Sequence, residues 1–503
     1  MKSNNRQAKH SGMAAMAVTM LTLAVLFAGA TPATAQTFTP LYSFDAWGQA
    51  FPDSPLVQGR DGSIYGETND DETSIYLMTP SGGYSVLWFA SLQTGDSGGD
   101  VCYSGMTVGP DGLLYGTCEI WEENNNASGI IFKYDPSQGQ NGFTILYTWP
   151  PIGDDRSEYP SPLTLGTDGN FYGTTNSDPT YPYGSVFKVT PSGTYTTLHA
   201  FQGANGNDGA YPSEETLFPG VVGTVPLALG KDGNFYGTTS EGGIAGQNNN
   251  GTVYKITPKG KIKIFYYFGS NTSAYGQYPQ GVTQGDDGNF YGQAFNGGAN
   301  DQGTIFKLTA GGKLTTLHSF NAAVDDAYCP KFALGLGPDG NFYQATSDWC
   351  GGGFLGYDSL YEITPKGKYT DLFNGFADPE TCTTDANGCI PSSPLLLHTN
   401  GTFYGTTFEG GVNERGIFYS FSTGLQPFVS LQWPLGSVGE TLGIFGQGFS
   451  SASGVSFNGA AASYNVESDT YMTATVPAGA TTGYVTVSEG AGSLRSNIKF
   501  TVK

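Results

Sequence analysis

The stretch Asp168-Gly-Asn-Phe-Tyr-Gly-Thr-Thr175 decides the fold of this chain of 503 residues, because it recurs along the sequence. The Asp-Gly pair predicts a tight turn, since Gly adopts positive φ without steric cost and Asp hydrogen-bonds the turn backbone. The aromatic and β-branched residues that follow predict a short β-strand. Seven copies are spaced by about 56 residues on average, and they begin at Asp61, Asp111, Asp168, Asp232, Asp287, Asp339 and Asn400.

Each turn belongs to a unit of four predicted strands, named A to D in chain order. A Pro-led apolar run such as Ser161-Pro-Leu-Thr-Leu165 precedes the turn as strand A, and two further motifs follow strand B. Their clearest copies are Gly251-Thr-Val-Tyr-Lys-Ile-Thr-Pro258 and Leu314-Thr-Thr-Leu-His-Ser-Phe320. Four-stranded units repeated seven times predict an all-β fold, a seven-bladed β-propeller over residues 36–424. Because the copies lie in separate units, we expect the repeated Asp residues to shape turns rather than to form a Ca²⁺ or substrate site.

The two ends of the repeat region predict how the ring closes. Phe38-Thr-Pro-Leu-Tyr-Ser-Phe44 matches the motif of strand D, yet it precedes the first unit. The seventh unit ends near Phe421 without a strand D of its own. We therefore expect the N-terminal strand to complete blade seven, which removes an exposed sheet edge.

The phrases DGNFYGTT, GTVYKITP and TTLHSF resemble those of the GloVer tandem-repeat proteins, exported bacterial proteins of largely unknown activity. The resemblance covers residues 37 to about 422. It implies a repeat architecture and export, and it implies no particular reaction. NHL-like propellers, whose repeats also place a DGN-type turn before an aromatic strand, are the alternative.

The repeat stops before residues 425–503, which form a separate β-rich segment. Gly439-Glu-Thr-Leu-Gly-Ile-Phe-Gly-Gln-Gly-Phe449 and Val476-Pro-Ala-Gly-Ala-Thr-Thr-Gly-Tyr-Val-Thr-Val487 resemble an IPT/TIG immunoglobulin-like domain. The resemblance implies a small Ig-like β-sandwich, of a kind that usually serves exported proteins as a spacer or adhesion module. No βαβ unit surrounds Gly446-Gln-Gly448, so this pattern is no dinucleotide fingerprint.

Residues 1–35 have the features of a secretory signal peptide. Basic Lys2, Arg6 and Lys9 precede an apolar run, and Ala33-Thr-Ala35 fits a cleavage site, so the mature chain is expected to begin at Gln36. A membrane anchor is the alternative for this run. We expect a secreted, cell-surface or periplasmic protein that is not inserted in a membrane after cleavage.

The net charge indicates which classes of partner are disfavoured, and the cysteines indicate the redox environment. The formal net charge of −22 disfavours nucleic acids and anionic membranes, and it leaves neutral glycans, cationic partners and Ca²⁺ open. No other cofactor is expected. Six Cys in an exported chain predict disulfides, and no pair has the C-x-x-C spacing of metal sites. Positions within the repeat predict the local pairs Cys102–Cys118 and Cys329–Cys350, and Cys382–Cys389 is predicted because these two Cys share one loop.

The loops of the predicted propeller divide into two classes. The A–B and C–D turns are short and uniform, whereas the B–C and D–A connections are long and differ in every unit. In a propeller these classes lie at opposite ends, here named the short-turn end and the long-loop end. Long loops on a rigid scaffold commonly carry function. Aromatic residues there can bind sugars or proteins, or can simply pack their own loops. The candidate ligand-binding residues are Trp47, Trp121, Trp149, Trp349, Tyr181 and Tyr183.

No catalytic residue is predicted, because the sequence lacks H-E-x-x-H, G-x-S-x-G and P-loop motifs. The sequence therefore favours a non-catalytic binding or cell-envelope protein that binds an extracellular glycan or protein at the long-loop end. A propeller lyase or hydrolase acting on an extracellular polymer is the alternative. A cluster of His, Tyr and carboxylates at the mouth of the central channel would favour the enzyme.

Overall fold

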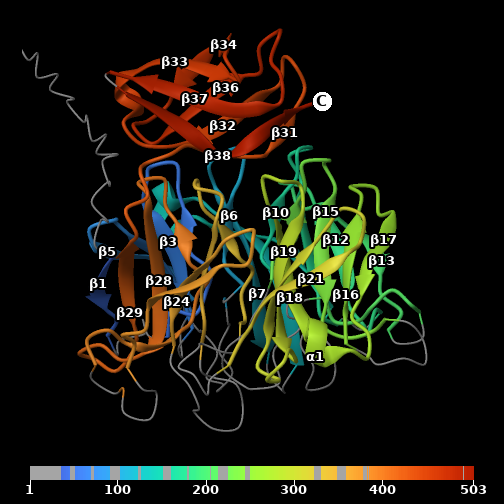
Figure 1. Ribbon diagram of the computed structural model, residues 1–503. Coiled ribbons are helices and arrows are strands. Elements are labelled where there is room, and N and C mark those ends of the chain that lie inside the picture. The colour runs from blue at the N-terminus through green and yellow to red at the C-terminus, as the bar shows by residue number, and fades with distance from the viewer. Residues whose placement is uncertain are drawn as a thin grey trace, which may run out of the picture. The chain divides into compact units, whose positions relative to one another are not determined.

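Strands dominate the computed structural model of the chain, and the short helical segments are confined to connections (Figure 1). Residues 36–503 form one unit. No helix in the part of the chain that the structure describes is long and apolar enough to cross a membrane. The predicted signal peptide lies outside the described residues. The structure describes residues 36–45, 51–69, 73–90, 102, 104–122, 126–150, 160–177, 180–203, 206–212, 225–243, 250–321, 330–347, 358–377, 382, 385–490 and 492–503. For residues 119–122 and 126–128 it describes the backbone but not the side chains.

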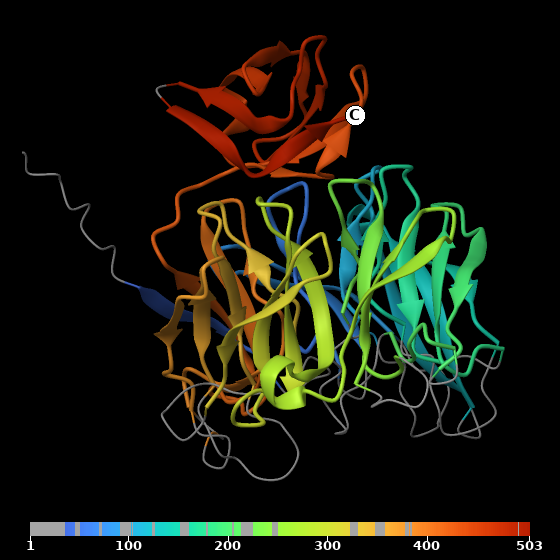
Figure 2. The ribbon, with the colours of Figure 1, turned by 45° about the vertical axis from the view of Figure 1, so that its right-hand side comes forward.

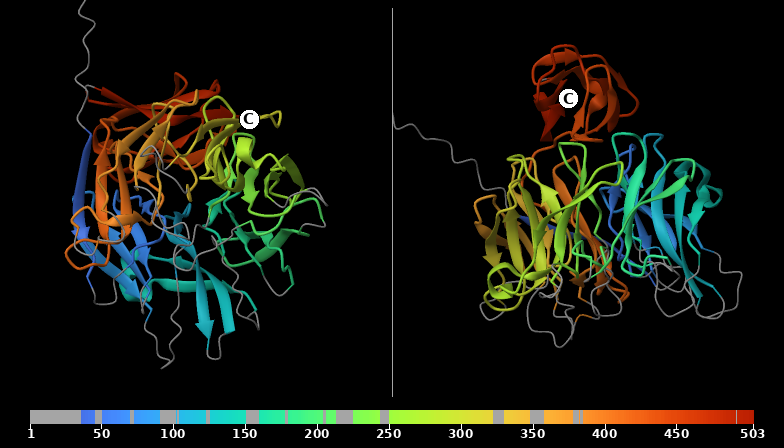
Figure 3. Two further views of the ribbon diagram at one scale, coloured as in Figure 1. Left: turned by 60° about the horizontal axis from the view of Figure 1, so that its bottom comes forward. Right: turned by 90° about the vertical axis from the view of Figure 1, so that its right-hand side faces the viewer.

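The repeat region forms seven antiparallel sheets that are arranged as the blades of a ring (Figure 3, left). In blades 1 to 6 the four strands lie side by side in chain order, which confirms the predicted all-β propeller. Blade 1 contains β2 (Val57–Gln58), β3 (Ile64–Thr68), β4 (Ser74–Met78) and β5 (Tyr84–Phe89). Blade 2 contains β6 (Met106–Val108), β7 (Leu114–Glu122), β8 (Asn126–Tyr134) and β9 (Phe143–Thr148). Blade 3 contains β10 (Thr164–Leu165), β11 (Phe171–Thr175), β12 (Ser185–Val189) and β13 (Tyr195–Ala200).

The same order continues around the ring. Blade 4 contains β14 (Ala228–Leu229), β15 (Phe235–Thr239), β16 (Thr252–Ile256) and β17 (Ile262–Tyr267). Blade 5 contains β18 (Gln277–Gln284), β19 (Phe290–Asn296), β20 (Thr304–Leu308) and β21 (Leu314–Ser319). Blade 6 contains β22 (Gly335–Leu336), β23 (Phe342–Ala345), β24 (Leu360–Ile363) and β25 (Tyr369–Phe373). Among the described residues of these blades, the helical segments are η1 (Pro136–Asn141) and α1 (Thr272–Tyr275).

Blade 7 closes the ring with a strand from the other end of the repeat region. Its own strands are β26 (Cys389–Pro391), β27 (Leu396–Leu397), β28 (Thr402–Glu409) and β29 (Ile417–Ser422). The N-terminal β1 (Thr37–Ser43) pairs antiparallel with β29, and Phe38 lies opposite Phe421. The predicted closure by the N-terminal strand is confirmed.

The repeated Asp-Gly turn forms as the sequence predicts. In blade 3, Gly169 has a φ of 76°, and Asp168 Oδ1 accepts a hydrogen bond of 3.2 Å from the Asn170 backbone N–H. The Tyr172 hydroxyl donates to the other oxygen of Asp168 at 2.8 Å. The Tyr hydroxyl donates to the turn Asp in the same way in the other blades that have Asp. In blade 7 Asn400 replaces Asp, and its Nδ2 donates to the Tyr404 hydroxyl. The motif carboxylates thus serve the turns.

The Tyr of strand B packs on the Phe of strand B in the following blade from blade 2 through to blade 7. The ring of Tyr172 in blade 3 stacks on Phe235 in blade 4 with centroids 4.1 Å apart, and Tyr291 lies 4.2 Å from Phe342 in the same way. These rings are buried, and such pairs add to the burial of apolar area. A second set of contacts comes from strand A, where Thr164 Oγ1 donates to the Leu227 carbonyl of the following blade at 2.7 Å.

Strand A is shorter than the sequence predicts. The run from Ser161 to Leu165 yields only Thr164–Leu165 as a strand, because Pro162 has no N–H to donate. Ser161 joins strand B differently: its N–H donates to the Thr174 carbonyl, and its Oγ accepts the Thr174 N–H, both at 2.9 Å.

The C-terminal segment folds into a sandwich of two sheets around one apolar core. Phe449, Met472 and Val485 lie fully buried between the sheets. One sheet contains β30 (Ser430–Leu431), β32 (Thr441–Phe445), β36 (Tyr471–Thr475) and β35 (Tyr464–Val466). The other contains β31 (Leu435–Gly436), β38 (Gly492–Val502), β37 (Gly483–Glu489), β33 (Ala452–Phe457) and β34 (Ala460–Ala462), and η4 spans Phe449–Ser451.

Candidate functional site

The β-sandwich contacts the propeller at its short-turn end (Figure 2). Thr470 Oγ1 donates a hydrogen bond of 2.6 Å to the Arg60 carbonyl of blade 1. The Tyr484 hydroxyl donates to Asp286 Oδ2 of blade 5 at 2.7 Å, and Gln447 Nε2 donates to Thr399 Oγ1 of blade 7 at 2.8 Å. The uniform turns of this end are therefore part of an internal interface.

Arg60 and Asp286, which directly precede a turn Asp, contact the sandwich, and Lys231 at the same position of blade 4 contacts Asp286. The Arg60 guanidinium lies 4.1 Å from the centroid of the Tyr471 ring, and Lys231 Nζ lies 2.9 Å from Asp286 Oδ1. Asp286 also accepts the Lys499 N–H at 3.2 Å. Burial opposes ionisation of Asp286, but hydrogen bonds from Lys231 and Tyr484 outweigh it and hold the pKa of this carboxyl below its ordinary value. These turns hold the sandwich in place.

Trp149 corrects the predicted set of ligand-binding aromatics. Its side chain is 2% exposed, and its Nε1 donates to the Tyr195 hydroxyl at 3.2 Å. It directly follows β9 and occupies the place that Phe201 takes after β13, where the last aromatic of strand D packs between blades. An alignment of these two D strands would have indicated a core residue, so Trp149 is not part of a ligand-binding surface.

The other predicted aromatics have mixed outcomes. The sequence placed Trp121 in a long loop, but it lies within β7, because β7 and β8 pair as far as Glu122 and Asn126. The Trp121 side chain, Trp47 and Trp349 lie outside the described residues. Tyr183, 37% exposed, and the half-buried Tyr181 precede β12 on the B–C connection, at the long-loop end.

Two of the three predicted disulfides are confirmed. Cys102–Cys118 joins the segment before β6 to β7, and Cys382–Cys389 joins a short loop to β26. The predicted pair Cys329–Cys350 lies outside the described residues and stays a prediction, which peptide mapping under non-reducing conditions would check.

Four buried charged side chains lie in blades 1 and 6, and the sequence analysis missed all of them. Their exposed fractions are 5% for Asp53, 0% for Glu67, 1% for Lys331 and 3% for Asp358. Such residues are almost never fully buried unless they are paired. Asp53 and Lys331 occupy the same place, four residues before strand A of their blades, and blade 7 lies between those two blades. The sequence did contain a signal for these residues, because a charged residue stands at positions where other copies of the repeat have a different residue.

Asp53 and Glu67 are held close together by the residues between them in the fold. Ser54, the neighbour of Asp53, accepts the Glu67 N–H on its Oγ at 2.8 Å. Asn69 Nδ2 donates to Asp53 Oδ2 at 3.2 Å, and the Gly105 N–H donates to Glu67 Oε2 at 2.9 Å. Burial raises the pKa of Asp53 to about 7 and that of Glu67 to about 8. Both groups therefore titrate near neutral pH.

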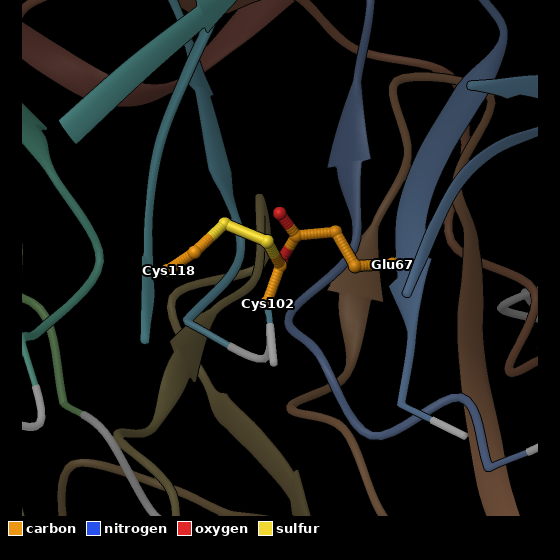
Figure 4. A group of neighbouring side chains, drawn as sticks. All are labelled: Glu67, Cys102 and Cys118. Atoms are coloured by element: carbon orange, nitrogen blue, oxygen red, sulfur yellow. A yellow bond between two sulfur atoms is a disulfide. The ribbon is translucent and has the colours of Figure 1, made fainter. Parts of the chain in front are cut away.

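The Glu67 carboxyl group faces the Cys102–Cys118 disulfide (Figure 4). One carboxylate oxygen and the two sulfur atoms lie within 4.8 Å of one another. A disulfide offers no thiolate, so its sulfur atoms form an apolar wall against the carboxyl group rather than a pair of metal ligands. This wall contributes to the burial that makes the charged form of Glu67 costly.

The second buried pair lies in blade 6. Asp358 Oδ2 accepts the Ile390 N–H from blade 7 at 2.8 Å. Burial lowers the pKa of Lys331 to about 7, and the charge of Asp358 acts in the opposite direction. The histidines of residues 36–503 lie elsewhere: His398 Nε2 contacts the Gly62 carbonyl at the short-turn end, while His199 and His318 lie in the D strands β13 and β21. Within the described residues, no cluster of His, Tyr and carboxylates forms at a channel mouth.

Comparison with solved structures finds matches of low sequence identity, one of which is a β-propeller domain. The WD40 β-propeller domain of Doa1 is 11% identical over 76% of this chain and 97% of that chain, with a TM-score of 0.43. A putative oxidoreductase (glucose dehydrogenase) from Thermus thermophilus is 16% identical over 65% and 99%, with a TM-score of 0.39. A protein of unknown function from Bacteroides thetaiotaomicron is 14% identical over 77% and 76%, with a TM-score of 0.38. At these identities the likeness concerns the fold alone.

No curated protein matches the chain. The Gloeobacter/Verrucomicrobia repeat family matches twice, over residues 29–225 and 222–441. These two matches cover most of the chain and the whole of the ring of blades, in agreement with the resemblance seen in the repeated phrases. The chain therefore belongs to the Gloeobacter/Verrucomicrobia repeat family.

Proposed function

We propose that this protein is an exported, non-catalytic binding or cell-envelope protein, which binds an extracellular glycan or protein at the long-loop end of its propeller. The observation that carries the proposal is the asymmetry of the two ends. The sandwich packs on the short-turn end through Arg60, Asp286 and Thr399, whereas the long connections gather at the opposite end. Variable loops on a rigid scaffold are the usual place for recognition.

Several features support export and a spacer role for the sandwich. The two disulfides fit an oxidising compartment, and the N-terminal residues fit a signal peptide that is removed at Ala35. The C-terminal sandwich resembles IPT/TIG modules, which suits a spacer between the propeller and a further surface. The negative charge disfavours nucleic acids and polyanions as ligands.

A screen of neutral polysaccharides and cell-envelope extracts against residues 36–503 tests the proposal. We expect Tyr183→Ala, Trp121→Ala and Trp349→Ala to weaken binding of the ligand so found at least several-fold. Lys259→Ala, in a C–D turn at the other end, is the control and should leave binding unchanged. Binding that is lost only on substitution at the short-turn end would contradict the assignment.

A lyase or hydrolase that acts on an extracellular polymer is the second candidate. The observation in its favour is the two separate buried pairs, Asp53 with Glu67 and Lys331 with Asp358, because the perturbed pKa values of Asp53, Glu67 and Lys331 are of a kind that often marks active sites. Exposed fractions of 5% or less keep a polymer from these atoms in this conformation. Release of soluble products from a polymer, abolished by Asp53→Asn, would favour the enzyme.

A further inference from the structure

Tyr211, at the long-loop end between blades 3 and 4, is held in a strained backbone conformation. Its φ of 57° lies in the left-handed region that residues with a Cβ atom rarely adopt. The Tyr211 N–H donates to the Tyr183 carbonyl at 3.0 Å, and the Ser240 N–H donates to the Tyr211 carbonyl at 3.1 Å. Both backbone groups of Tyr211 are therefore bound, which fixes the direction in which its side chain leaves the backbone. Strained residues that are fixed in this way often occur at ligand-binding sites.

The same backbone arrangement recurs at two other junctions between blades, and it does not require a tyrosine at the position of Tyr183. Phe51 and Tyr278 have φ values of 55° and 58°. The Phe51 N–H donates to the Arg415 carbonyl at 3.4 Å, and the Tyr278 N–H donates to the Asn250 carbonyl at 3.1 Å. Tyr183, Asn250 and Arg415 thus occupy equivalent positions, each directly before the glycine that precedes strand C. The fold accepts a polar residue there, so the arrangement does not need the aromatic ring of Tyr183.

The three strained aromatic residues differ in what covers their rings. The Phe51 ring stacks on Phe408 with centroids 4.5 Å apart, and Tyr278 packs against the buried core between blades 5 and 6. The Tyr211 ring instead lies 6.2 Å from the Tyr183 ring, at an angle of 60° between their planes. Tyr183 is itself 37% exposed. Packing within the loops therefore accounts for Phe51 and Tyr278, but it leaves the tyrosine pair open to solvent.

The exposed Tyr183 ring has a firm support in the backbone of Gly203. A Cβ atom on Gly203 would lie 2.8 Å from Cδ1 and Cε1 of Tyr183, so this glycine backbone lies directly against the ring. The Gly203 N–H donates to the Gly209 carbonyl at 3.2 Å. Asp208 Oδ2 lies 3.0 Å from His199 Nε2 of β13, which ties the same loop to blade 3. Tyr183 is thus held in place without a ligand, and such preorganisation lowers the entropic cost of binding.

The surroundings of the tyrosine pair favour a sugar over a protein as its ligand. Tyr183 carries the only exposed large apolar side chain among the described residues of 176–184, 201–212 and 240–251. Gln202 and Asn207, on the loop that supports it, are exposed and polar. A stable protein interface buries about 800 Å² on each partner around an apolar core, which one exposed ring does not supply. A sugar needs less, because one apolar face stacks on an aromatic ring while its hydroxyl groups bind polar neighbours.

We propose that Tyr183 and Tyr211 form a subsite for one pyranose ring of a neutral, β-linked polysaccharide. Pyranose rings with equatorial hydroxyl groups and β linkages have faces made of C–H bonds, and such a face stacks on Tyr183. The inclined ring of Tyr211 contacts the edge of the same sugar. The net charge of −22 disfavours chains of uronic acids. The inference rests on the proposed function, since both place recognition at the long-loop end, and it narrows the ligand to a neutral glycan.

Calorimetric titration of residues 36–503 with soluble oligosaccharides tests the proposal. The probes are cellohexaose, xylohexaose and laminarihexaose, which are neutral and β-linked, with hexagalacturonic acid as the anionic comparison. We expect measurable binding of at least one neutral probe and several-fold weaker binding of the anionic one, because the negative surface repels it.

Substitutions at the two tyrosines separate loss of the subsite from loss of the fold. Tyr183→Asn introduces the residue of blade 4, so it should unfold at the wild-type temperature and bind the neutral probe at least several-fold more weakly. Tyr183→Trp keeps an aromatic ring and should bind at least as tightly as the wild-type chain. Tyr211→Asn should also weaken binding with little loss of stability, because Asn tolerates the left-handed region. Tyr275→Ala is the control, since Tyr275 is 36% exposed at the same end but belongs to blade 5, and it should bind like the wild-type chain.

The possible failures of this inference are distinguishable from failure of the proposed function. Wild-type-like binding of the neutral probe by both Tyr183→Asn and Tyr211→Asn would overturn the subsite and leave a binding role for the long-loop end. Binding of a cell-envelope protein by a wild-type chain that binds none of the oligosaccharides would have the same meaning. An equal loss of affinity in Tyr275→Ala would overturn a subsite confined to the tyrosine pair. A wild-type chain that binds neither glycans nor proteins would contradict both proposals.

Discussion

Gly173 shows at the scale of one residue why the repeated motif tolerates so little change. It lies opposite Phe187 in the neighbouring strand, and a Cβ atom placed on it would lie 2.6 Å from Phe187 Cζ. The backbone of Gly173 is ordinary strand, so the restriction comes from the packed ring and not from φ. The same close approach of strand B to an aromatic ring recurs in most blades.

Gly173→Ala is therefore expected to destabilise the chain by about 1–3 kcal/mol, the usual cost of overpacking a core. Urea unfolding followed by tryptophan fluorescence would measure the loss. Gly454→Ala in β33 is the control, because a Cβ there would meet nothing within 4 Å. Equal unfolding midpoints for Gly173→Ala and the wild-type chain would show that Phe187 yields without cost.

Single residues also mark the limit of what the repeated motif predicts. Ile64-Tyr-Gly-Glu-Thr68 reads as one more copy of strand B, and its role as a strand was predictable from sequence. That Glu67 is buried was not, because the connection before β2 folds back on β3 only in the complete fold, where Ser54 accepts the Glu67 N–H. The sequence shows that Glu67 stands where other copies have Thr, but it does not show which residues surround the Glu67 side chain.

At the scale of elements, the sequence predicted the strands well because their signals are local. The Asp-Gly turn, the Phe-Tyr pair and the D-strand motif each lie within one short segment, so strands B to D and their turns follow from them. Strand A was predicted too long, since the hydrogen bonds of Ser161 to strand B replace regular pairing. Trp149 was misplaced because the long loop after it obscured its equivalence to Phe201.

The closing strand β1 carries a prediction of its own. Deletion of residues 36–45 should expose the edge of β29 and remove Phe38 and Phe44 from the cores of blades 7 and 1. We expect a clearly lower unfolding temperature and concentration-dependent association through the free edge. A synthetic peptide of residues 36–45, added in excess, should reverse both effects, whereas a scrambled peptide should not. An unchanged unfolding temperature would contradict a closing role for β1.

At the scale of the whole molecule, the propeller and the sandwich are joined through residues that the repeat leaves free to vary. The position before each turn Asp is Arg60 in blade 1, Lys231 in blade 4 and Asp286 in blade 5. Arg60 and Asp286 contact the sandwich, and Lys231 forms an ion pair with Asp286. From sequence they read as ordinary surface charges on uniform turns, because Tyr471 and Tyr484, the sandwich partners of Arg60 and Asp286, lie far away along the chain. The motif predicts each turn, but it does not predict what covers the turn.

The lowered pKa of Asp286 gives this interface a defined dependence on pH. A carboxyl group whose pKa is lowered in the folded state stabilises that state above its ordinary pKa of about 4, and the stabilisation is lost as the pH falls through the lowered value. Asp286→Asn removes the charge that Lys231 contacts and weakens acceptance from the Lys499 N–H. We expect this variant to unfold at a lower temperature than the wild-type chain at pH 7, with the difference shrinking as the pH approaches 3.

Scanning calorimetry of both chains between pH 7 and pH 3 would measure that difference, and proteolysis would locate its origin. The connection from Leu425 to Phe428 leads from blade 7 into the sandwich, so looser docking in Asp286→Asn should speed cleavage there at pH 7.5 while each part stays folded. Asp301→Asn, in a loop at the opposite end, serves as the control and should change neither measurement. If Asp286→Asn unfolds and is cleaved like the wild-type chain, the sandwich is held by Arg60 and Thr399 without help from Asp286, and the interface has no acid-sensitive contact at blade 5.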